Sequence, residues 1–124
     1  MNRVDRRYRV LAEMAWSEYP DIVVSAEPGK ERLRLHLADG SFLDVWFSRS
    51  IEGKYAFHWE RRHIDGTVYR WDNAAHRSLA GITTFPHHFH EGSQRNVKPF
   101  KPRNTWEDTL REILDYVREK LRAS

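Results

Sequence analysis

The hydrophobic and polar positions of this chain predict a helix near each end. From residue 4 to about 17, apolar side chains recur at the three- and four-residue spacing of one helical face. These side chains are Val4, Tyr8, Leu11, Ala12 and Ala15. We expect the Tyr19-Pro20 pair to end this helix. Residues 105–122 carry a second apolar stripe, and Thr105 or Asn104 can cap the helix that it predicts.

Between these segments the pattern changes to the two-residue period of β-strands. The β-branched run at residues 21–27 is bounded by prolines and predicts one strand. Residues 32–48 alternate on both sides of Asp39-Gly40, and residues 54–72 do so around Asp65-Gly66. An Asp-Gly pair between alternating segments is a strong hairpin signal. We therefore expect an antiparallel meander of about five strands.

The periodicity disappears between residues 73 and 104, where Gly, Pro, Ser, His and Asn dominate. A structureless stretch of this length is unusual inside a compact domain and is often functional. The expected architecture is a single two-layer α+β domain over residues 1–124. It has an N-terminal helix, the meander sheet, a long His-rich loop and a C-terminal amphipathic helix that covers a face of the sheet.

Composition narrows the functional classes. The chain has 124 residues and no cysteine, so disulfides are excluded. We expect neither a signal peptide nor a membrane span, which makes the cytoplasm the expected location. Its net charge is +3 and its pI is about 9.4, which favours acidic partners without establishing that the chain binds nucleic acid.

The second predicted hairpin suggests a binding face. With a two-residue turn at Asp65-Gly66, Glu60 would lie opposite Trp71, Arg62 opposite Tyr69 and His58 opposite Asn73. Exposed aromatic rings between cationic side chains can stack on bases and contact phosphates, although ordinary solvent-exposed residues fit the same pattern. The candidate nucleic-acid-binding residues are Arg61, Arg62, Tyr69, Arg70, Trp71 and Arg77.

The stretch TTFPHHFH, at residues 83–90, contains three of the seven histidines of the chain. In an extended segment His88 and His90 would point the same way, and His58 or His76 could complete a metal site. No HExxH helix, cysteine pair or acidic cluster accompanies them, so we expect no metal and no cofactor. Histidines that hydrogen-bond to loop carbonyls are a simpler explanation of the same spacing.

Catalysis without a metal is the other chemical hypothesis for the histidines. Beside a phosphodiester, two histidines can divide general-base and general-acid roles, while arginines stabilise the developing charge. RNA supplies its own nucleophile in the 2′-hydroxyl. The candidate catalytic residues are His58, Asn73, His76, His87, His88 and His90.

Two blocks, HWERRHIDGTVYRWDNAAH and TFPHHFH, resemble the TumE-like family of toxins from prokaryotic toxin-antitoxin systems. The resemblance is detailed over residues 55–90 and points to these positions: His58, Trp59, Arg70, Trp71, Asp72, Asn73, Ala74, His76, Phe85, Pro86, His87, His88 and His90. The chain departs from the family pattern at Ala75, Arg77 and Phe89, where the family has proline, histidine and lysine. A role that needs that lysine is not available here.

The resemblance implies a small cytoplasmic toxin with a helix-turn-helix antitoxin as its partner. Our first hypothesis is therefore a toxin that acts on RNA, as a metal-independent ribonuclease or as a translation blocker. The alternatives are a non-enzymatic protein-interaction module and a metal-binding hydrolase at the histidine loop. No membrane partner is expected, and the sequence leaves the oligomeric state open.

Overall fold

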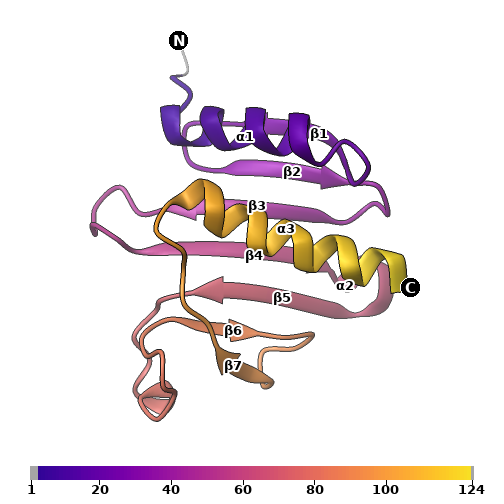
Figure 1. Ribbon diagram of the computed structural model, residues 1–124. Coiled ribbons are helices and arrows are strands. Elements are labelled where there is room, and N and C mark those ends of the chain that lie inside the picture. The colour runs from indigo at the N-terminus through magenta and orange to yellow at the C-terminus, as the bar shows by residue number, and fades with distance from the viewer. Residues whose placement is uncertain (1–2, 124) are drawn as a thin grey trace. The chain divides into compact units, whose positions relative to one another are not determined.

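The computed structural model describes residues 3–123, which form two compact units (Figure 1). The first unit contains the described residues up to Gly40 and those from Pro102 onward, and the second contains Ser41–Lys101. The predicted α+β class and the helices near both ends of the chain are confirmed. Whether the two units fold together as one domain stays a prediction.

The first unit is built from two helices and a strand pair. Its elements are α1 (Arg6–Glu18), β1 (Val23–Pro28), β2 (Leu33–Leu37) and α3 (Trp106–Ala123). Strands β1 and β2 pair in antiparallel fashion, and α1 packs against both strands and against α3. The predicted apolar positions become the core because helical and strand periodicity each collect them on one face. Buried examples are Tyr8, Leu11, Leu33, Leu35, Leu110, Ile113 and Leu114.

The ends of the two long helices follow the expected capping chemistry. Asp5 accepts a hydrogen bond from the backbone N–H of Arg7 at 2.8 Å, and Thr105 Oγ1 accepts one from Asp108 at 3.0 Å. Thr105 is thus the cap that the sequence offered. No helix within residues 3–123 is long and apolar enough to cross a membrane.

The second unit is an antiparallel strand series with short helical insertions. Its elements are β3 (Phe42–Phe47), β4 (Tyr55–Arg61), α2 (Arg62–Asp65), β5 (Thr67–Asp72), η1 (Arg77–Leu79), β6 (His88–His90) and β7 (Val97–Pro99). Each strand pairs with the next in sequence order. The core face of this sheet is aromatic, with buried Phe57, Trp59, Tyr69, Trp71 and Phe89.

The expected strand count of about five was too low. The described residues form seven strands, two in the first unit and five in the second. The two additional strands, His88–His90 and Val97–Pro99, lie within the stretch that was expected to be one long loop. Each has three residues, too few to show a two-residue period, and their pairing with neighbouring strands defines them.

The register expected for the second hairpin was wrong. Instead of a two-residue turn, α2 makes one helical turn after β4, and Gly66 follows it at a φ of 81°. This longer connection places His58 opposite Arg70 and Phe57 opposite Trp71. The partners of β5 therefore shift by three positions, and an odd shift exchanges the faces of a strand.

Candidate functional site

The corrected register brings polar side chains together on one face of β4, β5 and β6. Paired residues in a sheet point to the same side, as do residues two apart along a strand. His58, Arg70 and His90 form one row across the three strands, and Asp72 with His88 lies in the neighbouring row. These five residues are hereafter called the Asp72 cluster.

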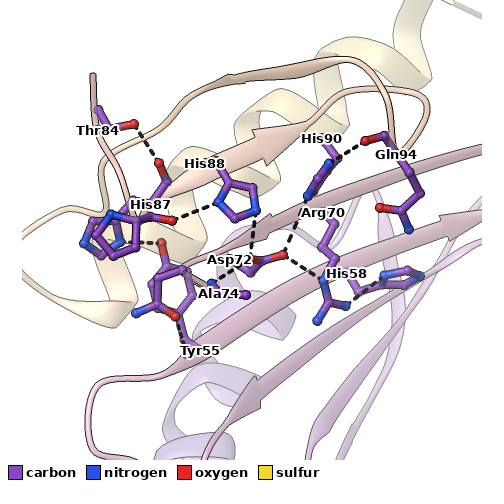
Figure 2. Close-up of polar contacts among 12 residues, drawn as sticks. Tyr55, His58, Arg70, Asp72, Ala74, Thr84, His87, His88, His90 and Gln94 are labelled. Carbon is purple, nitrogen blue, oxygen red and sulfur yellow. Dashed lines mark hydrogen bonds and ion pairs between the residues drawn. The ribbon is translucent and has the colours of Figure 1, made fainter. Parts of the chain in front are cut away.

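Asp72 is the centre of this cluster (Figure 2). Its side chain is almost fully buried, and its two oxygens accept hydrogen bonds at 2.9 Å from the Ala74 N–H and from Nε of Arg70. The Nε2 atom of His88 lies 2.9 Å from Oδ1, and that of His90 lies 4.0 Å from Oδ2. One buried carboxylate thus faces two imidazoles and a guanidinium.

Backbone carbonyls orient both imidazoles. Nδ1 of His88 lies 2.8 Å from the Pro86 carbonyl oxygen, and Nδ1 of His90 lies 3.0 Å from that of Gln94. A carbonyl oxygen only accepts, so each Nδ1 must carry the proton and donate it. Burial lowers the pKa of His90, which favours its neutral form, in which Nε2 offers a lone pair toward Asp72.

A chain of polar contacts runs outward from the carboxylate along β5 and β4. Arg70 lies 3.3 Å from Nδ1 of His58, and a guanidinium only donates, so His58 accepts there through Nδ1. Its Nε2–H can then donate to Glu60 at 3.1 Å. Hydrogen bonds from Arg62 hold the pKa of Glu60 well below its ordinary value. These hydrogen bonds fix the tautomer of His58 and the position of Arg70.

His87 belongs to a separate contact with Tyr55. The Tyr55 hydroxyl lies 3.0 Å from Nδ1 of His87, and the two rings stack with centroids 5.8 Å apart. Burial raises the pKa of Tyr55 and lowers that of His87, so a neutral phenol and a neutral imidazole face each other. Asn73 ties the backbone beside this pair, because it accepts from the Tyr55 N–H and donates to the Gly53 carbonyl.

The structure brings together some of the candidate catalytic residues and separates others. His58, His88 and His90 meet around Arg70 and Asp72, whereas His76 precedes η1 and is exposed. His87 and Asn73 both contact Tyr55. The catalytic roles assigned to these residues stay predictions.

The expected aromatic binding face is not formed by Tyr69 and Trp71. Both rings lie on the buried face, where Tyr69 stacks on Trp59 and Trp71 stacks on Phe89 at centroid distances of 4.8 and 4.5 Å. The assumed two-residue turn had placed them beside His58. Among the arginines, Arg61 is buried over Trp59, whereas Arg62 and Arg77 are exposed.

Asp72, Glu60 and Tyr55 were absent from the predicted site residues, although each contacts a histidine. One signal for Asp72 was present in the sequence, because the toxin resemblance included its position. With the correct register, Asp72 would also have been predicted on the same face as His58 and Arg70.

The fold and the Asp72 cluster define a small α+β protein with a partly buried histidine, arginine and aspartate centre. The family model described as toxin TumE matches residues 8–121. The chain therefore belongs to the TumE toxin family, as the two sequence blocks had indicated. No curated protein and no solved structure matches the chain.

Proposed function

We propose that this toxin acts on RNA and that the Asp72 cluster is its reaction centre. The main observation that supports this proposal is the convergence of His88, His90 and Arg70 on the buried Asp72 carboxylate. Buried ionisable groups with oriented partners are typical of sites that move protons or bind charged ligands. Family membership supports a toxin, and the cationic composition of the chain supports an anionic target such as RNA.

The roles within the cluster follow from how far each side chain is exposed. Arg70 is 36% exposed and His58 is 20% exposed, so a phosphate group could reach both. Arg70 would stabilise charge on the phosphate, and His58 would exchange a proton with the substrate. His88 is only 1% exposed, which gives it an internal role in place of direct contact with RNA.

The sequence favoured a metal-independent reaction, and within the cluster we assign the proton exchange with the substrate to His58. Purified protein would then cleave total RNA in the presence of EDTA. His58→Ala should abolish both cleavage and growth inhibition, because His58 is the imidazole that hydrogen-bonds Arg70. The matched control is His36→Ala, since His36 lies in the first unit and forms its ion pair with the exposed Glu27.

The outcomes test separately the role of His58, the choice of RNA as the target and the effect of histidine replacement on stability. Normal toxicity in a folded His58→Ala variant would remove the assigned role of His58. Toxicity without any RNA cleavage or RNA binding would remove RNA as the target. Loss of toxicity in the His36→Ala control would show that histidine replacement acts through stability and not through the cluster.

A second candidate function is a non-enzymatic interaction module, and one feature of the first unit favours it. An open groove of about 450 Å³ lies between α1 and β1, with a largely apolar lining that includes Trp16, Ala12 and Ala26. Trp16 is 55% exposed, and exposed tryptophans are common at protein interfaces. A helix-turn-helix antitoxin is the proposed partner, and Trp16→Ala should weaken copurification with it while leaving RNA cleavage intact.

A further inference from the structure

We propose that Asp72, His88 and His90 bind a first-row divalent transition-metal ion of the Zn²⁺ type. The ligands would be a carboxylate oxygen of Asp72 and Nε2 of each histidine. Ligand atoms of the three residues lie within 4.8 Å of one another. This inference does not rest on action on RNA, and it departs from the sequence expectation that no metal is involved.

The first argument is the orientation of the two imidazoles. Both Nδ1 atoms donate to backbone carbonyls, of Pro86 and Gln94, and so both Nε2 atoms are left to bind a cation. Metal-binding histidines usually donate their other ring N–H in this way, because the hydrogen bond fixes the tautomer and the ring orientation. The cluster has this arrangement twice (Figure 2).

The second argument is the unsatisfied nitrogen of His88. His88 is 1% exposed, and its Nε2 makes no hydrogen bond of acceptable geometry within residues 3–123. The nearest Asp72 oxygen is only 2.9 Å away but lies outside the direction in which a ring N–H would point. Buried polar atoms without a partner are uncommon and costly. A lone pair facing a carboxylate needs a cation to make the contact favourable.

The third argument is distance. Two ligands that bind one ion at about 2.1 Å lie roughly 3–3.5 Å apart. Nε2 of His88 lies 2.9 Å from Oδ1 of Asp72, which is slightly shorter than this, and Nε2 of His90 lies 4.0 Å from the other oxygen, Oδ2, which is slightly longer. A small rotation of the His90 ring would bring all three ligands to one ion. The strands β5 and β6 need not move, because their pairing already sets the three side chains on one face.

The ligand set selects the kind of ion. Two imidazoles with one carboxylate suit Zn²⁺ or Fe²⁺, whereas Mg²⁺ and Ca²⁺ prefer oxygen ligands. Three protein ligands leave a position open in a tetrahedral site. Arg70 donates to the same carboxylate, so it would share the Asp72 charge with the ion and would stand beside any anion bound at the open position.

The test is direct metal binding by untagged protein. Chain stripped of metal by chelation should bind one equivalent of Zn²⁺ in calorimetry, and Co²⁺ should give a visible absorption spectrum. His90→Gln should weaken Zn²⁺ binding at least 100-fold, since it removes a ligand from the more exposed side of the site. His36→Gln, which alters a histidine outside the cluster, should bind as the unaltered chain does.

Thermal unfolding provides a second measurement that does not depend on toxicity. Zn²⁺ should raise the Tm of the unaltered chain and of His36→Gln, but not that of folded His90→Gln, because a ligand stabilises the state that binds it. Absence of Zn²⁺ binding by the unaltered chain would overturn the proposal. Equal Zn²⁺ binding by His90→Gln, or preference for Mg²⁺, would also overturn it.

Because these assays contain no RNA, their outcomes are independent of the proposed function. Zn²⁺ binding without RNA cleavage would support the metal site and count against the ribonuclease. RNA cleavage in EDTA by a chain that binds no Zn²⁺ would do the reverse.

Discussion

Each unit of this protein contains a buried polar group on which several partners converge, but the two groups differ in how completely they are satisfied. In the first unit, the Tyr19 hydroxyl lies 2.8 Å from an Asp115 oxygen and 3.1 Å from the Arg111 carbonyl. Burial raises the pKa of Tyr19, so the phenol keeps its proton to donate. In the second unit, the Asp72 carboxylate faces imidazole nitrogens, one of which has no hydrogen bond among the described residues.

This difference separates a structural polar group from a candidate functional one. Tyr19 joins the end of α1 to α3, and Arg118 lies over its ring at 4.6 Å, so its partners account for its position. Protein interactions alone leave the Asp72 cluster with facing acceptor atoms. A buried group whose hydrogen bonds are incomplete implies a further ligand or a proton, whereas a satisfied group does not.

Replacement of Asp72 should have the largest effect on stability. In Asp72→Ala, the Ala74 N–H and the Arg70 guanidinium lose their acceptor, and the expected loss is about 3 kcal/mol of unfolding free energy. Urea denaturation measures this loss, and toxicity should disappear with it. Asp72→Asn keeps one carbonyl acceptor, so it should be more stable than Asp72→Ala and still lack toxicity. A fully toxic Asp72→Asn variant would contradict the functional side of the comparison.

Removal of the Tyr19 hydroxyl should have a smaller effect, confined to stability. Tyr19→Phe keeps the buried ring and loses the hydrogen bonds to Asp115 and Arg111, at a cost of about 1 kcal/mol. Urea denaturation and a growth assay on the same variant should show reduced stability with unchanged toxicity. Reduced toxicity in a variant that remains folded at the assay temperature would show that the first unit contributes more than structure.

The smallest expected effect is a difference between the two units in how acid changes the free energy of unfolding. The pKa of Glu60 is lowered in the folded state by Arg62, so its stabilising contribution is present above its unfolded value and is lost as pH falls below about 4.5. Glu60→Gln should therefore show a smaller loss of stability between pH 6 and pH 3 than the unaltered chain. These two pH values lie on either side of the ordinary pKa of a glutamate carboxyl, which is about 4.3.

The matched variant in the first unit is Glu18→Gln. Arg111 lowers the pKa of Glu18 as well, but that pair is exposed and screened by solvent. The loss of stability in acid should therefore differ less between Glu18→Gln and the unaltered chain than between Glu60→Gln and the unaltered chain. Equal changes in the two variants would show that the more enclosed position of Glu60 has no thermodynamic consequence.

The periodicity of the sequence predicted most of the fold, and the errors of that prediction lie in short segments. Both long helices and the alternating segment that contains β2 were predicted because many residues repeat the same spacing. The Thr105 cap was predicted from its residue type just before the second helix. Strands β6 and β7 were missed because three residues cannot define a period. Their order comes from pairing with neighbouring strands, which is a tertiary interaction that sequence pattern does not contain.

The candidate site was predicted in composition but not in arrangement. His58, His88, His90 and Arg70 were all named, yet the partner of His58 was wrong because a one-turn helix stands where a two-residue turn was assumed. That error moved Trp71 to the polar face in the prediction. Asp72, which was not among the predicted site residues, is buried and faces the histidines.

The single turn of α2 joins β4 to β5, and the number of residues in this connection sets the register between the two strands. If β5 slipped by one residue, Trp71 would take the place of Arg70 opposite His58 and the aromatic core would lose its ring. A slip of two residues would keep every side chain on its own face but set Asp72 opposite His58. Related toxins with a longer or shorter connection should therefore absorb the difference within the turn itself, so that the arginine and the histidine remain partners.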